Sequence, residues 1–246
     1  MEKIALITGA AGGLGQSMAS RLIAGGWRLI VSSRDGDRLA EVYGDQHLQI
    51  VADCSTVAGV RHIFEVAKAQ QMLPTALAHC VGNIRLGALH RMPEADFMDC
   101  LNANLISAFH TLAGFVGALR EANSPGAAVL VSSAAARIGT PNHEAIAAAK
   151  GGLEGLVRGA AATYASAAIR INAVAPGIMD TPAAARILGS APAREAAARQ
   201  YPLPGVGTPD ELAELMVWLL SESAARVTGQ VWSMDAGFAS IRPLVK

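Results

Sequence analysis

Short apolar runs alternate with longer stretches of helical periodicity along the whole chain. The apolar runs predict strands at Lys3–Thr8, Arg28–Ser32, Leu48–Ala52, Ala76–Cys80, Ala127–Ser132, Ile169–Ala173 and Gln230–Met234. The stretches between them predict helices at Gly13–Ala24, Thr56–Gln70, Glu94–Arg120, Ile146–Tyr164 and Pro209–Ser221. Strands that alternate with helices form right-handed crossovers and therefore a parallel sheet. Because the strand runs are apolar throughout instead of alternating with polar residues, we expect helices on both faces.

The expected architecture is an α/β, single-domain, Rossmann-type fold, a doubly wound sheet of about seven mostly parallel strands. A length of 246 residues fits one such domain over residues 1–246. The stretch Pro176–Pro209 is rich in Ala, Pro and Gly and departs from the alternation. We interpret it as an excursion from the sheet that contains a substrate lid near residues 178–206.

The composition supports a folded protein and excludes some partners. Hydrophobic residues make up 52% of the chain and charged residues 16%, which is enough apolar surface for a large core. The formal net charge of +0 gives no electrostatic basis for binding nucleic acid or an anionic membrane. The first apolar run, Ile4–Ile7, is too short for a signal peptide or a membrane span. Cys54, Cys80 and Cys100 form no metal-like cluster and suit a reducing compartment, so we expect a cytoplasmic protein without a bound metal.

A glycine-rich turn follows the first predicted strand and opens the first predicted helix. Its sequence is Thr8-Gly9-Ala10-Ala11-Gly12-Gly13-Leu14-Gly15. Glycines permit a close approach of the backbone to a diphosphate, and a helix N-terminus offers free N–H groups and a positive dipole end. The turn therefore predicts a dinucleotide site, with an ordinary strand–helix turn as the alternative.

With this turn the chain resembles the short-chain dehydrogenase/reductase family, whose loop Thr-Gly-x-x-x-Gly-x-Gly is matched by Thr8, Gly9, Gly13 and Gly15. The resemblance continues over nearly the whole chain. It includes Asn104, Ser132-Ser133, Lys150, the run Ile169–Gly177 and the segments Gly207–Glu211 and Thr228–Gly237. It implies an oxidoreductase that binds a nicotinamide dinucleotide and assembles through its long helices as a homodimer or homotetramer.

The resemblance also assigns the cofactor-binding positions. They are Gly9, Gly12, Gly13, Leu14, Gly15, Ser33, Arg34, Asp53, Cys54, Val81, Gly82, Lys150, Pro176, Gly177, Ile178 and Thr181. At the end of the second strand, where an acid would select NAD(H), the chain has Ser33 and Arg34. A guanidinium can bind a 2′-phosphate through two hydrogen bonds, so we expect NADP(H). Two alternatives remain: Arg34 is a solvated residue at the start of the next helix, or Asp35 turns inward and favours NAD(H).

Three of the family's four catalytic positions are matched. The resemblance implies that Asn104 holds a water relay, that Ser133 orients the substrate oxygen, and that Lys150 binds the nicotinamide ribose and lowers the pKa of a tyrosine four residues earlier. That position holds Ile146, which can neither donate nor accept a proton. Loss of a general acid costs about 10²–10⁴-fold in rate. The protein therefore uses another acid, reduces a substrate that needs less help, or has lost catalysis.

His143 is the candidate replacement. It precedes Lys150 by two helical turns, so the two side chains share a face if the helix starts near Pro141. Histidine shuttles protons at neutral pH. The alternative is a solvated residue in the first helical turn. After the fourth strand, His79 and Cys80 replace two amides of the family. We expect His79 to satisfy backbone groups in the core, and Cys80 to be a small buried hydrophobe.

We therefore expect an NAD(P)(H)-dependent oxidoreductase that transfers a hydride between NADP(H) and a small or apolar carbonyl, alcohol or conjugated enone, because small apolar residues wall the expected site. The alternative is a catalytically impaired nucleotide-binding relative that acts as a redox sensor or an oligomeric scaffold. Ser133 and Asn104 favour the enzyme, since a protein that only binds nucleotides has less need of them. Ile146 favours the alternative.

Overall fold

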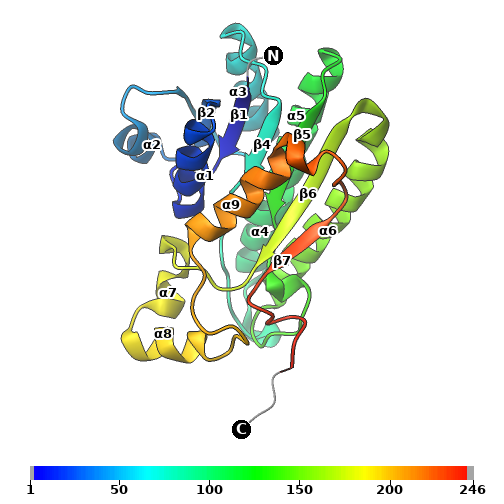
Figure 1. Ribbon diagram of the computed structural model, residues 1–246. Helices are drawn as coiled ribbons and strands as arrows, with labels where there is room; N and C mark the ends of the chain where they lie inside the picture. Colours follow the sequence, from blue (N-terminus) through cyan, green and yellow to red (C-terminus); the bar gives the residue numbers. More distant parts are fainter. Residues whose placement is uncertain (1–2, 243–246) are drawn as a thin grey trace.

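The computed structural model describes residues 3–242 and shows a parallel sheet with helices on both faces (Figure 1). The strands are β1 (Ile4–Thr8), β2 (Arg28–Ser33), β3 (Leu48–Val51), β4 (Ala76–His79), β5 (Gly126–Val131), β6 (Ile169–Pro176) and β7 (Val231–Met234). The helices are α1 (Gly13–Ala24), α2 (Gly36–Tyr43), α3 (Val57–Ala69), α4 (Glu94–Leu101), α5 (Ser107–Glu121), α6 (Glu144–Tyr164), α7 (Ala185–Leu188), α8 (Ala191–Ala198) and α9 (Pro209–Leu220). Every predicted strand is confirmed, with ends that differ by up to three residues.

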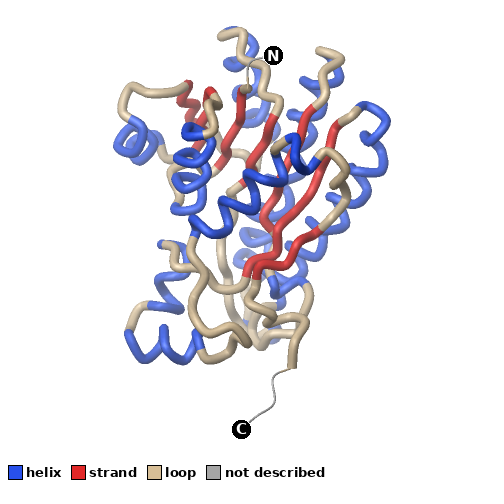
Figure 2. Tube along the Cα trace, viewed as in Figure 1, coloured by secondary structure: helices blue, strands red, loops and turns tan. Residues whose placement is uncertain are grey.

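The strand order is β3-β2-β1-β4-β5-β6-β7, and every neighbouring pair is parallel. In β1, Ile7 pairs with Val31 of β2 on one side and with Ala78 of β4 on the other. The chain thus moves outward from β1 to β3 and then returns to the other side of β1. In sheets of this kind, ligands bind where the order reverses, at the carboxyl ends of the strands. Figure 2 shows that the longer loops gather at that end of the sheet.

Two apolar layers sandwich the sheet. Alternate residues of β1 face opposite layers: Leu6 packs with α3, α5 and α6, and Ile7 packs with α1 and α9. This burial on both faces explains why central strands such as β1 and β5 are almost entirely apolar. Within residues 3–242, no helix is both long and apolar enough to cross a bilayer. Residues 1–2 and 243–246 of the expected domain lie outside the described range.

The helix predicted at Glu94–Arg120 is interrupted in the structure. Between α4 and α5 the backbone widens into a π-helical turn at Asn102–Ile106. A single π turn inserts one residue into a helix and often occurs at a functional site. The buried Asn104, only 1% exposed, lies in this turn.

Two further differences concern helix ends and the expected lid. Helix α6 begins at Glu144, so His143 is its N-cap residue. The prediction that His143 shares a helical face with Lys150 assumed that the helix starts near Pro141 and that His143 lies in its first turn. Helix α2, for which the sequence analysis gave no range, begins after Asp35, whose carboxylate accepts a hydrogen bond from the amide of Arg38. The stretch after β6 contains the short helices α7 and α8, which lie apart from the sheet in Figure 1.

Candidate active site

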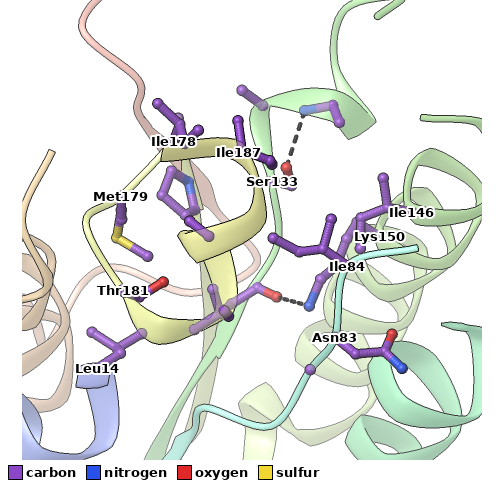
Figure 3. A pocket seen from close by; sticks show the side chains of 18 of the residues that line it. Leu14, Asn83, Ile84, Ser133, Ile146, Lys150, Ile178, Met179, Thr181 and Ile187 are labelled. Atoms are coloured by element: carbon purple, nitrogen blue, oxygen red, sulfur yellow. Dashed lines mark hydrogen bonds between the residues drawn. The ribbon is translucent and has the colours of Figure 1, made fainter. Parts of the chain in front are cut away.

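A cavity of about 420 Å³ opens at the carboxyl ends of β1, β4, β5 and β6 (Figure 3). It brings together most of the residues predicted for the site. The predicted residues that line it are Gly9, Gly12, Gly13, Leu14, Gly15, Val81, Gly82, Asn104, Ser133, His143, Lys150, Pro176, Gly177, Ile178 and Thr181. Ser33, Arg34, Asp53 and Cys54 are not part of its lining.

The glycine-rich turn is shaped by contacts that exclude side chains. Gly9 has φ +68°, and a Cβ there would lie 2.9 Å from the carbonyl group of Cys80. A Cβ on Gly15 would collide with the carbonyl oxygen of Gly9. Tyr43 supports the turn from α2, because its buried hydroxyl donates to the carbonyl of Ala10 at 2.9 Å. The backbone of this turn is therefore packed at distances that only glycine allows.

The first turn of α1 faces the cavity without a capping side chain. Its N-cap residue is Gly12, and neither a capping hydrogen bond nor an acidic residue serves this end of the helix among the described residues. The first N–H groups of a helix have no intrahelical partner, and the helix dipole adds positive potential there. A diphosphate fits these donors, so this end of the cavity is suited to a dinucleotide.

Lys150 is buried at the bottom of the cavity. Its Nζ donates to the carbonyl oxygen of Val131 at 2.6 Å (dashed line from Lys150 in Figure 3), and the residue is 5% exposed. Burial lowers the pKa of Lys150 from 10.5 to about 8, and the nearby Cys100 and Cys80 oppose this shift. The amine is therefore protonated at neutral pH and loses its proton as the pH rises through about 8.

Asn104 presents an unused acceptor next to this amine. Its Nδ2 donates to the carbonyl oxygens of Cys100 and Asn83 and to Oδ1 of Asn83. Its Oδ1 is buried and has no partner among the described residues. A Cβ on Gly82 would lie 2.6 Å from this Oδ1 and 3.5 Å from Lys150 Nζ, so the two polar atoms flank the same glycine. Buried polar atoms without partners are rare, and this one is suited to a water or a ligand.

Ser133 and His143 approach the cavity from the loop between β5 and α6. Ser133 Oγ accepts the amide proton of Ala135 at 3.2 Å, which leaves its own hydroxyl proton for another acceptor. His143 Nδ1 lies 2.7 Å from the carbonyl oxygen of Pro141. Because a carbonyl can only accept, Nδ1 carries the proton and Nε2 is the nitrogen that remains free.

Ile146 occupies the wall of the cavity one helical turn before Lys150. It is 5% exposed and packs with Cys100, Ala145 and Ala149. Figure 3 shows Ile146, Ile84 and Ile187 around the same space. The side chain that the sequence analysis identified as a departure from the family therefore lies in the site itself.

Several lining residues escaped the sequence analysis. Tyr201 accepts the amide proton of Ile178 through its hydroxyl at 2.7 Å, packs against Gly177, and its ring lies 5.1 Å from that of Phe238. Asn83, Ile84 and Leu86, from the loop after β4, also line the cavity and were not predicted. Tyr201, Met179, Ile187, Ala197 and Gln200 fall within the lid predicted near residues 178–206. The loop from Asn83 to Leu86 follows the predicted pair Val81-Gly82 but matches no motif itself, so the sequence offered no signal for these three residues.

The wall beyond Lys150 is mainly apolar. Lys150 is the only lysine or arginine among the described residues that line the cavity. The nearby Arg85 and Arg137 form ion pairs with Asp99 at 2.7 Å and with Glu154 at 3.2 Å. The surface offered to a substrate therefore has no guanidinium for a carboxylate or phosphate group.

His79 has a structural role under the site. Its Nδ1 lies 2.8 Å from the hydroxyl of Thr8, and its Nε2 lies 3.1 Å from that of Ser107. The Ser107 hydroxyl donates to the carbonyl of Ala103, so it accepts from His79 Nε2, while Nδ1 accepts from Thr8. The expectation that His79 bonds backbone groups is wrong, because both partners are hydroxyls. Burial lowers its pKa to about 3, so it stays neutral.

Cys80 lines the cavity but is unreactive there. Burial raises its pKa to about 12, and the nearby charge of Lys150 opposes this shift. Cys54 is 5% exposed in the core beneath β3, and burial raises its pKa to about 11. Both thiols act as small apolar groups.

The end of β2 carries the residues expected to select the cofactor. Ser33 Oγ accepts the amide proton of Asp35 at 3.2 Å. The Asp35 carboxylate caps α2 by accepting the amide proton of Arg38 at 2.9 Å. Asp53 bonds the amide and hydroxyl of Ser55, and these bonds, with a smaller effect of the nearby Arg34, hold its pKa below the usual value. Arg34, which lies between Ser33 and Asp35 in the sequence, is exposed.

Comparisons with known proteins bear on the family and on the fold. The family model described as enoyl-(acyl carrier protein) reductase matches residues 9–239. The chain is 32% identical to cis-4-hydroxycyclohexanecarboxylate dehydrogenase of Sinomonas cyclohexanicum, over 98% of each chain. It is also 32% identical to 3-oxoacyl-[acyl-carrier-protein] reductase FabG of Pseudomonas aeruginosa, over 96% of each chain. A solved structure of ElxO with NADP bound has the same fold, with a TM-score of 0.90 at 24% identity over 98% of this chain and 100% of the other.

Proposed function

The chain belongs to the short-chain dehydrogenase/reductase family of oxidoreductases, and from this premise we propose that it transfers a hydride between NADP(H) and a small or apolar carbonyl, alcohol or conjugated enone. The observation that carries the proposal is the convergence of the uncapped α1 terminus, Lys150 and Asn104 on one mainly apolar cavity. The nicotinamide supplies or accepts the hydride when it is bound.

The residues present fit a nicotinamide dinucleotide. The α1 terminus would hold the diphosphate, and Pro176, Gly177, Ile178 and Thr181 would line the nicotinamide end beside Val81 and Gly82. Asp53 and Cys54 would border the adenine. Arg34, free of the capping duty that engages Asp35, would bind a 2′-phosphate and favour NADP(H), with NAD(H) as the weaker cofactor. The NADP held by ElxO is in keeping with this choice.

The proton step falls to the chain's own side chains. In the proposed arrangement Ile146 stands where the family has its tyrosine, and His143 takes over the proton. Neutral His143 presents the lone pair of Nε2, so it accepts the hydroxyl proton when an alcohol is oxidised. In the direction of reduction, His143 protonated on both nitrogens returns that proton to the substrate oxygen. Ser133 donates its hydroxyl proton to the same oxygen and orients it.

Lys150 and Asn104 have supporting roles. The ammonium of Lys150 would bind the ribose and stabilise negative charge on the substrate oxygen. The free Oδ1 of Asn104 would hold a water beside Lys150, through which protons exchange with solvent. Lys150 is held by its hydrogen bond to Val131 and Asn104 by its hydrogen bond to Cys100 before any ligand arrives, so both groups need little reorganisation.

We further propose that residues 178–206 act as a lid. Helices α7 and α8 bury only a small apolar cluster of Ala184, Leu188 and Ala197, against Ile178 and Val206. Such thin packing gives a low local stability, as expected of a segment that opens for substrate. A single exposed ion pair, Arg194 with Asp180 at 2.7 Å, ties α8 to the segment after β6.

For assembly, we propose a homodimer or homotetramer formed through α5 and α6. Among residues 3–242, no atom lies within 4 Å of where a Cβ on Gly151, Gly155 or Gly159 of α6 would be, and Phe109 of α5 is 47% exposed. Glycine surfaces allow close helix packing between subunits. Light scattering of the purified protein would show the dimer or tetramer.

The experiment is a turnover screen with matched histidine variants. Purified protein is assayed for NADPH oxidation with apolar ketones and conjugated enones, and for NADP⁺ reduction with the corresponding alcohols. We expect His143→Ala to lose about 10²-fold or more of the turnover while binding NADPH normally. The exposed His62→Ala on α3 is the control and should retain turnover. Unchanged turnover in His143→Ala would contradict the proposed role of His143. Ile146→Tyr, which introduces the tyrosine that the family has at this position, should raise turnover.

The alternative function, a nucleotide-binding relative without catalysis, is supported by the apolar side chain of Ile146 in the site. The same screen separates the two. Tight NADPH binding without turnover over the whole panel would favour the alternative.

A further inference from the structure

A polar chain runs from the surface of α4 to the buried amide of Asn104. Asp99 Oδ2 accepts hydrogen bonds from Arg85 Nε at 2.8 Å and from Asn83 Nδ2 at 2.7 Å. Asn83 Oδ1 in turn lies 3.1 Å from Asn104 Nδ2. The residues come from the loop after β4, from the last turn of α4 and from the π turn, so three segments meet in this chain.

The direction of each bond follows from the carboxylate at the outer end. A carboxylate accepts and does not donate, so the Asn83 amide must turn its NH₂ group toward Asp99. The carbonyl oxygen of that amide then faces Asn104 and requires the NH₂ group of Asn104 on that side. Asn104 Nδ2 also meets the carbonyl oxygens of Asn83 and Cys100, at 3.0 and 2.9 Å. The remaining Oδ1 is thereby directed toward Gly82, next to Lys150.

Without the Asp99 carboxylate, the orientation of the Asn83 side-chain amide would no longer be fixed. The side-chain amide of Asn83 could rotate and present its NH₂ group to Asn104. The NH₂ groups of the two side chains would then face each other, and neither could accept a hydrogen bond. Asn104 would then lose one of its acceptors, and its own amide would be free to turn its donor toward the cavity. The backbone carbonyls of Cys100 and Asn83 would still attract the NH₂ group, so we expect a mixture of orientations.

We propose that Asp99 is a positioning residue, which fixes the orientation of the Asn104 amide through Asn83 so that a hydrogen-bond acceptor, not a donor, faces the reaction chamber. Asp99 does not line the cavity, and its side chain is 44% exposed in the ion pair with Arg85. The inference rests on the proposed function only for the catalytic use of Asn104. The orientation itself is independent of that use.

Three variants separate the orientation effect from ordinary packing. Asp99→Leu removes the acceptor. Asn83 Nδ2 and Arg85 Nε both donate to Oδ2 of Asp99, so a single oxygen at this position serves both. Asp99→Asn keeps one such oxygen and is therefore the conservative variant expected to retain the orientation. Arg85→Leu breaks the same ion pair but leaves the bond between Asn83 and Asp99, and an exposed pair contributes little to stability. Thermal unfolding of all three shows that each variant is folded.

The primary readout is the side-chain amide of Asn104 in a ¹⁵N-labelled NMR spectrum, identified as the signal pair that Asn104→Ala removes. We expect Asp99→Leu to shift or broaden this pair, and Asp99→Asn and Arg85→Leu to leave it in place. An unchanged pair in Asp99→Leu overturns the proposal whether or not the protein shows turnover.

The second readout is the turnover rate against NADPH affinity. We expect Asp99→Leu to lower kcat about tenfold at unchanged NADPH affinity, since a misplacement of about 1 Å can cost 10²-fold in rate. Asp99→Asn should restore kcat. A fall of equal size in Arg85→Leu also overturns the proposal, because that variant keeps the orienting bond. A shifted Asn104 signal with unchanged kcat supports the positioning and contradicts the catalytic use of Asn104.

Discussion

Lys150 is anchored to β5 by the 2.6 Å hydrogen bond from its Nζ to the carbonyl oxygen of Val131. Ser133 follows that strand by two residues, so one strand end sets the positions of both polar groups. The bond keeps a cationic group in a place where only 5% of the residue is exposed. Burial of this kind has consequences for stability and for pH dependence.

The free energy of unfolding should rise when this charge is removed. Burial lowers the pKa of Lys150 from 10.5 to about 8, and each pKa unit corresponds to about 1.4 kcal/mol. At neutral pH the amine is protonated in both the folded and unfolded states, so the full cost of burial, about 3 kcal/mol, is present. We expect Lys150→Met to increase the free energy of unfolding by up to that amount and to abolish turnover, as measured by urea denaturation and by assay. A less stable variant would show that Lys150 stabilises the fold.

The catalytic rate should fall at a lower alkaline pH than it would if Lys150 had the usual lysine pKa of 10.5. The proposed role requires the protonated amine, which is lost as the pH rises through about 8. We expect kcat/KM to decline above about pH 8, together with NADPH affinity measured over the same range. A rate that stays constant to pH 10 would contradict the assigned role of Lys150.

Acid should destabilise the protein through His79. Burial lowers the pKa of His79 from 6.5 to about 3, so between these values the unfolded chain binds a proton that the folded chain does not. Stability from this group is complete above pH 6.5 and is lost as the pH falls. We expect a loss of about 3 kcal/mol between pH 6.5 and pH 4.

The matched control is His79→Asn, which retains groups that can donate and accept but does not titrate. Urea denaturation at several pH values should show a flatter acid limb for this variant than for the natural chain. Parallel curves would mean that His79 is solvated or charged in the folded state.

Much of the fold could be predicted because burial on both faces leaves a direct pattern in the sequence. The strands around Ile7 and Val129 are almost entirely apolar, and the glycine turn has a strict steric requirement at Gly15. The π turn at Asn104 leaves no such pattern, since it depends on one extra residue accommodated by tertiary packing. The place of Tyr201 within the predicted lid could not be derived for a related reason, because its contact with Ile178 joins two segments through the fold alone.

Cofactor choice should depend on Arg34. We expect Arg34→Ala to weaken NADPH binding by tenfold or more, on the order of 1.5 kcal/mol or above for a charge-assisted bond, and to leave NADH binding nearly unchanged. Arg38→Ala is the control, because Arg38 is engaged with Glu41 at 2.6 Å on the same helix. Fluorescence titration with both cofactors measures the difference. An equal loss for NADPH and NADH would remove Arg34 from the 2′-phosphate site.

The central claim is that the bare amides at the start of α1 hold the diphosphate of a nicotinamide dinucleotide. Calorimetric titration with NADPH tests it most directly, using the natural chain and two variants. In Gly15→Ala the Cβ would collide with the Gly9 carbonyl, and in Gly117→Ala the Cβ would have no atom of the described part of the chain within 4 Å. The account predicts binding of one NADPH per chain by the natural protein and by Gly117→Ala, and no measurable binding by Gly15→Ala. Absence of heat with both NADPH and NADH in the folded natural chain, or full binding by Gly15→Ala, would contradict it.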